Sequence, residues 1–127
     1  MKVDNPKAVV ERFNVCINNR DLECLASLMT EDHVFIDAGG DVCRGRESVI
    51  ETWRRFFDQF PDYRNHFDLI EPDRGVVLIA GRSRCSFKPL DGPALWTAKV
   101  RDNRIAEWRV CLDTKRNRKK LNLLTPI

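Results

Sequence analysis

Residues 45–61 read GRESVIETWRRFFDQFP, and this stretch decides the fold. Its apolar side chains recur every three or four residues, which is the spacing of one face of an α-helix. They are Val49, Ile50, Trp53, Phe56, Phe57 and Phe60. Pro61 cannot continue a helix, so the pattern predicts an aromatic-faced helix that ends just before it.

Two shorter helices are predicted upstream. Asn5-Pro6 is a favourable start, because an Asn side chain caps free amide groups and Pro fits the first helical turn. An apolar stripe follows over residues 9–17, and Asp21 is a favourable cap for a second helix over residues 22–29.

Strands are predicted on both sides of the aromatic helix. Residues 33–38 lead into Gly39-Gly40, which is typical of a strand that ends in a turn. Four more strands follow over residues 63–71, 75–87, 94–101 and 104–113. The connection Asp102-Asn103 tolerates positive φ and favours a tight hairpin, and consecutive strands this close together should be antiparallel.

The predicted order is therefore ααβαββββ. It indicates an α+β fold in which a strongly curved antiparallel sheet wraps around the helices as a cone-shaped barrel, with an apolar hollow at its open end. At 127 residues the chain is expected to be a single domain over 1–127, with 114–127 as a basic C-terminal tail.

Composition excludes several classes of function. No apolar run approaches the roughly 20 residues that span a bilayer, and the N-terminus lacks a secretory signal pattern, so we expect a cytoplasmic protein without membrane contact. Residues 115–120 carry five of the positive charges behind a net charge of only +3. Because this basicity is local and lacks interleaved aromatics, no nucleic-acid partner is predicted.

The five cysteines are scattered, with no Cys-x-x-Cys pair and no histidine at metal-ligand spacing. We interpret them as small buried apolar residues in a reducing compartment. His33 and His66 also lack ligand partners at recognisable spacing, so no metal and no cofactor are predicted.

Several segments together resemble the nuclear transport factor 2-like (cystatin-like) superfamily and, within it, the SnoaL-like domains. They are NRDLE at residues 19–23, MTEDHVFID at 29–37, RGRE at 44–47, FPD at 60–62 and the hairpin over 100–113. The resemblance covers residues 6–113 and implies the cone-shaped fold. The superfamily holds enzymes and plain binding modules, so the function depends on the residues of the site.

Two enzyme branches of this superfamily are incompletely matched. The resemblance to ketosteroid isomerase puts Asp37 at the position of the base, but Phe13 stands where that family has the tyrosine of its oxyanion hole. The resemblance to limonene epoxide hydrolase puts Phe35 at its tyrosine and Asp113 at its water-activating aspartate. The acid of that family is absent from residues 82–84, Arg-Ser-Arg.

SnoaL-type polyketide cyclases require fewer catalytic groups than these two enzymes, namely one acid/base aspartate in a closed apolar pocket. The resemblance implies that Asp113 supplies this group, with Asp37 as a second carboxylate. It also places Arg109, Cys111 and Asp113 inside and leaves Trp108, Val110 and Leu112 for the outer sheet face, where a homodimer partner could cover them. The alternative for Asp113 is an exposed aspartate at a strand end.

The other candidates have structural alternatives. His33, Phe35 and Asp37 share one strand face, but Asp37 could instead cap the turn at Gly39-Gly40. Arg82 and Arg84 could pair with the carboxylates, bind an anionic ligand, or simply be solvated. Trp53 and Trp96 belong either to the core or to a ligand site. The candidate ligand-binding residues are Trp53, Phe35, His33, Phe13, Arg82, Arg84, Trp96 and Cys111.

The first functional hypothesis is a SnoaL-like homodimer that binds a small, largely apolar organic molecule, with acid/base chemistry by Asp113 and Asp37. The second is a non-enzymatic ligand-binding or protein-interaction module on the same fold. A carboxylate desolvated in the pocket would favour the first.

Overall fold

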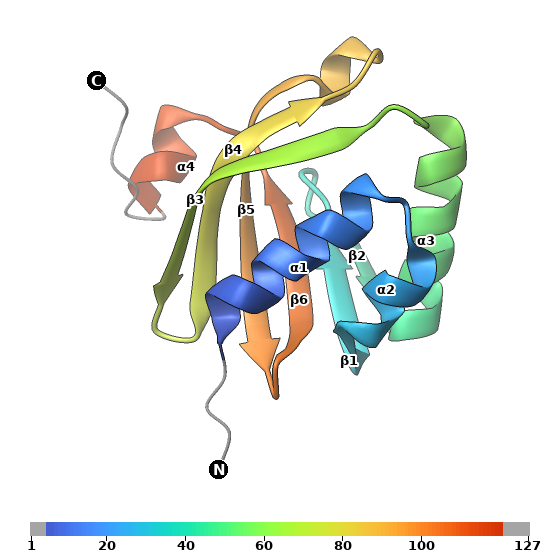
Figure 1. Ribbon diagram of the computed structural model, residues 1–127. Coiled ribbons are helices and arrows are strands. Elements are labelled where there is room, and N and C mark those ends of the chain that lie inside the picture. Colours follow the sequence, from blue (N-terminus) through green and yellow to red (C-terminus); the bar gives the residue numbers. More distant parts are fainter. Residues whose placement is uncertain (1–4, 121–127) are drawn as a thin grey trace.

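Both N-terminal helices begin at the caps that the sequence predicts. The computed structural model describes residues 5–120, and the first helix in it, α1, covers Pro6–Asn18 (Figure 1). The Asn5 side chain accepts a hydrogen bond from the Ala8 N–H at 3.3 Å. Asp21 caps α2 (Leu22–Ser27) through the Cys24 N–H at 3.0 Å. Each cap satisfies an amide that the first helical turn leaves without a partner.

The aromatic stripe forms α3 (Arg46–Gln59), and six strands form one sheet. The strands are β1 (Met29–Ile36), β2 (Val42–Arg44), β3 (Arg64–Asp73), β4 (Val76–Arg84), β5 (Gly92–Arg101) and β6 (Arg104–Cys111), with a 3-10 turn, η1 (Lys88–Leu90), between β4 and β5. Their order in the sheet is β2-β1-β6-β5-β4-β3. β1 and β6 are parallel, and all other neighbours are antiparallel.

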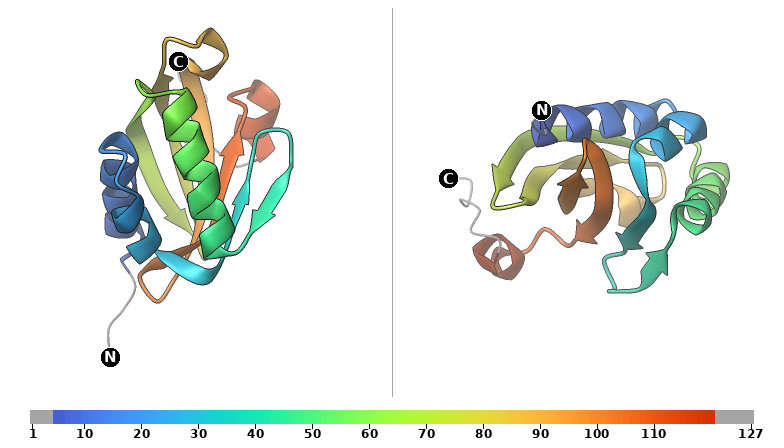
Figure 2. Two further views of the ribbon diagram at one scale, coloured as in Figure 1. Left: turned by 90° about the vertical axis from the view of Figure 1, so that its right-hand side faces the viewer. Right: turned by 90° about the horizontal axis from the view of Figure 1, so that it is seen from below.

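The sheet curves around the helices, as predicted for this α+β fold. α1 packs across the sheet against β3, while α3 packs against β1 (Figure 2). The curl does not close into a barrel, because β2 and β3 remain as edges. Asp102 and Asn103 have φ values of 53° and 57°, which confirms the predicted tight hairpin between β5 and β6.

Besides η1, two elements were not predicted. β2 has three residues, too few to show an alternating pattern, and it pairs with β1. Residues 115–120, expected to be a solvated tail, form the short helix α4 (Lys115–Lys120), and four of these six residues are exposed. The hydroxyl of Thr114, just before this helix, accepts a hydrogen bond from the Asn117 N–H at 3.1 Å. The apolar end of the tail, with Leu121, Leu123, Leu124 and Ile127, lies outside the described residues.

The three tryptophans join the helices to the sheet. Trp53, Trp96 and Trp108 are 7%, 1% and 1% exposed. The Trp108 ring centroid lies 4.8 Å from that of Phe13 on α1, and the Trp96 centroid lies 4.8 Å from that of Phe67 on β3. This aromatic cluster is the centre of the core. Within residues 5–120, none of the helices has the length and apolar character needed to cross a membrane.

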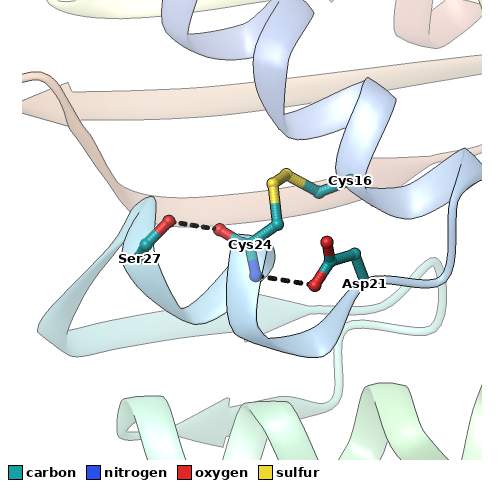
Figure 3. Close-up of a disulfide and its surroundings, with 4 residues drawn as sticks. All are labelled: Cys16, Asp21, Cys24 and Ser27. Carbon is teal, nitrogen blue, oxygen red and sulfur yellow. Dashed lines mark hydrogen bonds between the residues drawn. A yellow bond between two sulfur atoms is a disulfide. The ribbon is translucent and has the colours of Figure 1, made fainter.

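A disulfide links the two N-terminal helices, and it corrects the expectation that all five cysteines are reduced. Cys16 on α1 is bonded to Cys24 on α2, with their Cα atoms 5.6 Å apart (Figure 3). That separation is typical of disulfides. No sequence pattern predicts this pair, because it depends on how tightly α2 folds back on α1. Cys43, Cys85 and Cys111 are free.

Thiol counting tests this pairing. Without reductant, the unfolded chain is expected to show three reactive thiols, and the reduced chain five. Reduction should lower the free energy of unfolding by about 2.5 kcal/mol, because a cross-link between positions near in sequence still restricts the unfolded chain. Urea unfolding with and without a phosphine reductant measures the loss, and Cys24→Ser should make the protein insensitive to the reductant. Five thiols without reductant would contradict the pairing.

Candidate functional site

A cavity of about 460 Å³ opens between α3, β1 and the inner face of β5 and β6. Its walls are mostly apolar, and six aromatic side chains dominate them. The lining residues are Phe35, Asp37, Ala38, Gly39, Thr52, Trp53, Phe56, Tyr63, Leu90, Trp96, Trp108 and Val110. The volume is in the range of ligand sites for small organic molecules.

Asp37 is both a turn residue and a cavity residue. Its Oδ1 accepts hydrogen bonds from the Gly39 and Asp41 N–H groups, each at 2.9 Å, which fixes the turn between β1 and β2. The same side chain lines the cavity, where it is the one charged group among the described lining residues. Asp37 therefore caps the turn and also lines the cavity, the two alternatives that the sequence allows.

Two hydroxyl groups complete the polar part of the lining. The Thr52 hydroxyl donates to the Ser48 carbonyl at 3.0 Å. The Tyr63 hydroxyl lies 3.2 Å from Ser83 Oγ, and because Ser83 donates to Asn65 Oδ1 at 2.7 Å, Tyr63 donates to Ser83. Burial raises the pKa of Tyr63, so this hydroxyl is neutral.

Of the predicted ligand-binding residues, Phe35, Trp53 and Trp96 line the cavity together with Asp37. Phe13 and His33 do not line it, and both are fully buried in the core. His33 Nδ1 lies 2.6 Å from the Ile105 carbonyl oxygen, so Nδ1 carries the proton and donates. Burial lowers the pKa of His33, which makes it a neutral structural residue.

The structure reverses the face of β6 that the family resemblance implied. Trp108 is 1% exposed and lines the cavity, so it is not on the outer face where a dimer partner was expected to cover it. Val110 is half-buried and lines both this cavity and the hollow described next. Arg109, Cys111 and Leu112 instead line a separate hollow that includes Lys99 and Glu107. Burial raises the pKa of the Cys111 thiol. Homodimerisation itself stays a prediction.

The predicted position of Asp113 inside the pocket is also wrong. It follows the end of β6, is not among the cavity residues, and pairs with Arg118 of α4. Its Oδ1 accepts from Arg118 Nε at 2.6 Å and its Oδ2 from Arg118 Nη2 at 2.9 Å. Both carboxylate oxygens are thereby engaged by one guanidinium.

Arg82 and Arg84 also lie away from the cavity. They alternate on β4 with Ser83, which is buried and faces Tyr63, so the two arginines are exposed on the opposite side of the sheet. Their strand partners there are His66 and Arg64. In residues 5–120, no cluster of three or more His, Cys, Asp or Glu side chains is placed to hold a metal ion.

Sequence reasoning missed part of the lining. The lining residues that were not proposed as site residues are Ala38, Gly39, Thr52, Phe56, Tyr63, Leu90, Trp108 and Val110. Thr52 lies one helical turn before Phe56 on α3, and Val110 follows Trp108 by two residues on β6, so periodicity could have found both. Leu90 lies in η1 and reaches the cavity through loop geometry that no periodic pattern records.

Comparison with solved structures shows the same fold. A putative polyketide cyclase from Sinorhizobium meliloti has 16% identity and a TM-score of 0.74, covering 81% of this chain and 93% of its own. An epoxide hydrolase from M. tuberculosis, similar to limonene epoxide hydrolase, has 23% identity and a TM-score of 0.73, covering 85% and 82%. IdmH, a putative polyketide cyclase from Streptomyces antibioticus, has 22% identity and a TM-score of 0.71, covering 94% and 99%.

Other structures of similar shape are described as nuclear transport factor 2-like, as a cystatin fold and as ketosteroid isomerase-like. No curated protein matches the chain. The profile of the SnoaL-like domain matches residues 10–108, which is most of the 127-residue chain. The protein therefore belongs to the SnoaL-like domain family.

Proposed function

We propose that the cavity binds a small, largely apolar organic molecule and that Asp37 is its acid/base group. The observation that carries this proposal is the lining, in which six aromatic rings and one carboxylate surround about 460 Å³. Such walls exclude water from a bound ring system, and the carboxylate supplies a proton acceptor within reach. The family supports the same class, because solved structures of this fold include proteins described as polyketide cyclases and an epoxide hydrolase.

The hydrogen bonds of the Tyr63 and Thr52 hydroxyls limit the reactions that the cavity can catalyse. Tyr63 donates to Ser83 and Thr52 donates to the Ser48 carbonyl, so neither hydroxyl proton is free to stabilise a new oxyanion. The reaction that this site supports is removal of a proton from a carbon acid whose anion is delocalised within the substrate. Asp37 Oδ2 is the accepting atom, since Oδ1 already accepts two backbone N–H groups.

5-Nitrobenzisoxazole tests binding and base together. It is a neutral, planar molecule, and removal of its C3 proton breaks the N–O bond and gives a coloured 2-cyano-4-nitrophenolate. We expect saturable turnover by the native protein and quenching of its tryptophan fluorescence. Asp37→Asn should lower kcat by about a hundredfold while leaving the quenching unchanged, because Asn keeps the Oδ1 acceptor of the turn but cannot take the proton.

Two further variants separate the possible results. Val110→Phe fills the cavity and should raise KM, whereas Asp41→Asn removes a neighbouring carboxylate that does not line the cavity and should change nothing. Equal turnover by the native protein and Asp37→Asn would contradict the role of Asp37 as the base. The cavity would then remain a proposed binding site without base chemistry. Loss of both saturation and quenching in the native protein would remove the ligand site altogether.

A further inference from the structure

The charge of the cavity points to a class of ligand. Its described lining contains the Asp37 carboxylate and no Arg, Lys or His side chain. A wall with a net negative charge repels carboxylates, sulfonates and phosphates, and it favours a ligand that brings a positive charge to the carboxylate.

The aromatic walls favour the same sign of charge. Phe35, Trp53, Phe56, Tyr63, Trp96 and Trp108 contribute rings to the lining. Consecutive rings stand at steep angles, with 69° between Phe35 and Trp53, 83° between Trp53 and Phe56, and 87° between Phe56 and Tyr63. These rings therefore do not stack in parallel, and their faces point in different directions. The faces of aromatic rings are electron-rich and attract ammonium groups that have lost part of their hydration.

The Asp37 carboxylate is available for such a group. Its Oδ1 is held by the Gly39 and Asp41 amides, which fixes its position beside the cavity. No ion pair involves Asp37 among the described residues. Arg109 and Lys120 share with it the separate hollow on the other side, but neither lies within ion-pair distance.

We propose that the ligand is an organic cation, an alkylammonium group attached to an apolar ring or chain, with its charge beside Asp37 and its apolar part among the six rings. This inference rests on the proposed ligand-binding function and narrows it to one class of molecule. The volume of about 460 Å³ accommodates a benzyl group with a trimethylammonium head.

Three ligands of nearly identical shape test the charge. Benzyltrimethylammonium carries the cation, neopentylbenzene is its neutral isostere, and phenylmethanesulfonate is an anion of similar size. Calorimetry and tryptophan fluorescence with the full-length native protein should show saturable binding of the cation and none of the anion. Asp37→Asn should weaken the cation by about tenfold, the scale of a cation–carboxylate contact at a partly exposed site, and leave neopentylbenzene unchanged.

Asp41→Asn is the matched control, because it removes a carboxylate from the same turn without altering the lining. It should leave the affinity for the cation unchanged. If neopentylbenzene bound and benzyltrimethylammonium did not, the proposal of a cationic ligand would be wrong, while the proposed ligand site would stand. An equal loss in Asp41→Asn, or binding of the sulfonate as tight as that of the cation, would also overturn the proposal of a cationic ligand. Failure of all three ligands would instead reject the proposed function.

Discussion

Trp108→Ala is expected to lower the free energy of unfolding by about 4 kcal/mol, which is the scale for removing a large aromatic side chain from a core. Trp108 is 1% exposed, and its ring centroid lies 4.8 Å from Phe13 and 6.1 Å from Phe67. Removing the ring takes away these contacts with α1 and β3 and enlarges the cavity that Trp108 lines. Urea unfolding followed by circular dichroism measures the loss.

Trp108→Phe should cost clearly less, because it retains an aromatic ring against Phe13. Arg109→Ala changes the next residue, whose side chain faces the other side of β6, and should alter stability by about 0.5 kcal/mol or less. If Trp108→Ala cost less than about 1 kcal/mol and changed the oligomeric state instead, Trp108 would be on the outer face as the family resemblance implied.

The two faces of β6 show where sequence reasoning succeeds and where it fails. Apolar and polar residues alternate along this strand, with Trp108, Val110 and Leu112 on one face and Arg109, Cys111 and Asp113 on the other. The hydrophobic effect alone predicts that the apolar face packs against the core. The resemblance to enzymes with a buried aspartate favoured the opposite. In the structure Trp108 and Val110 line the cavity, so the burial rule was the better guide for these two residues. Leu112 lies just past the end of β6 and is 61% exposed, as the resemblance implied.

Other elements were predictable because their signals are local. Asn5 and Asp21 are caps, and α3 follows from a stripe of six apolar residues with Pro61 after it. Phe35 and Asp37 were correctly placed on one face because a strand alternates with a period of two.

The remaining features depend on contacts between distant segments. Arg20 donates from Nη2 to the Tyr63 carbonyl at 2.7 Å, and Asn18 donates to the Asn65 carbonyl at 2.9 Å. These bonds hold the start of β3, and with it the Tyr63 ring, against the α1–α2 connection. Each of these bonds joins residues more than 40 positions apart in the sequence, so no local pattern predicts that Tyr63 lines the cavity.

Gly81→Ala is expected to lower the free energy of unfolding by about 3 kcal/mol, at the upper end of the range for overpacking. Gly81 on β4 is paired with Phe67 on β3, beside the register shift between Phe67 and Leu69. An added Cβ would overlap the His66 carbonyl oxygen and lie 2.9 Å from Phe67 Cα. Both are backbone atoms, so β3 must move as a whole, and the Phe67 ring would leave its position 4.8 Å from Trp96.

Gly39→Ala is the matched control, because the same methyl group there meets only Asp37 Oδ1, at 3.4 Å. That change should be neutral or slightly stabilising, since Ala restricts the unfolded chain more than Gly does. Chemical unfolding of both variants gives the comparison, and hydrogen exchange of the β3 amides should rise in Gly81→Ala alone. Equal stability of the two variants would show that β3 can yield at the bulge without loss of packing, and that the aromatic wall of the cavity does not depend on this close approach of two backbones.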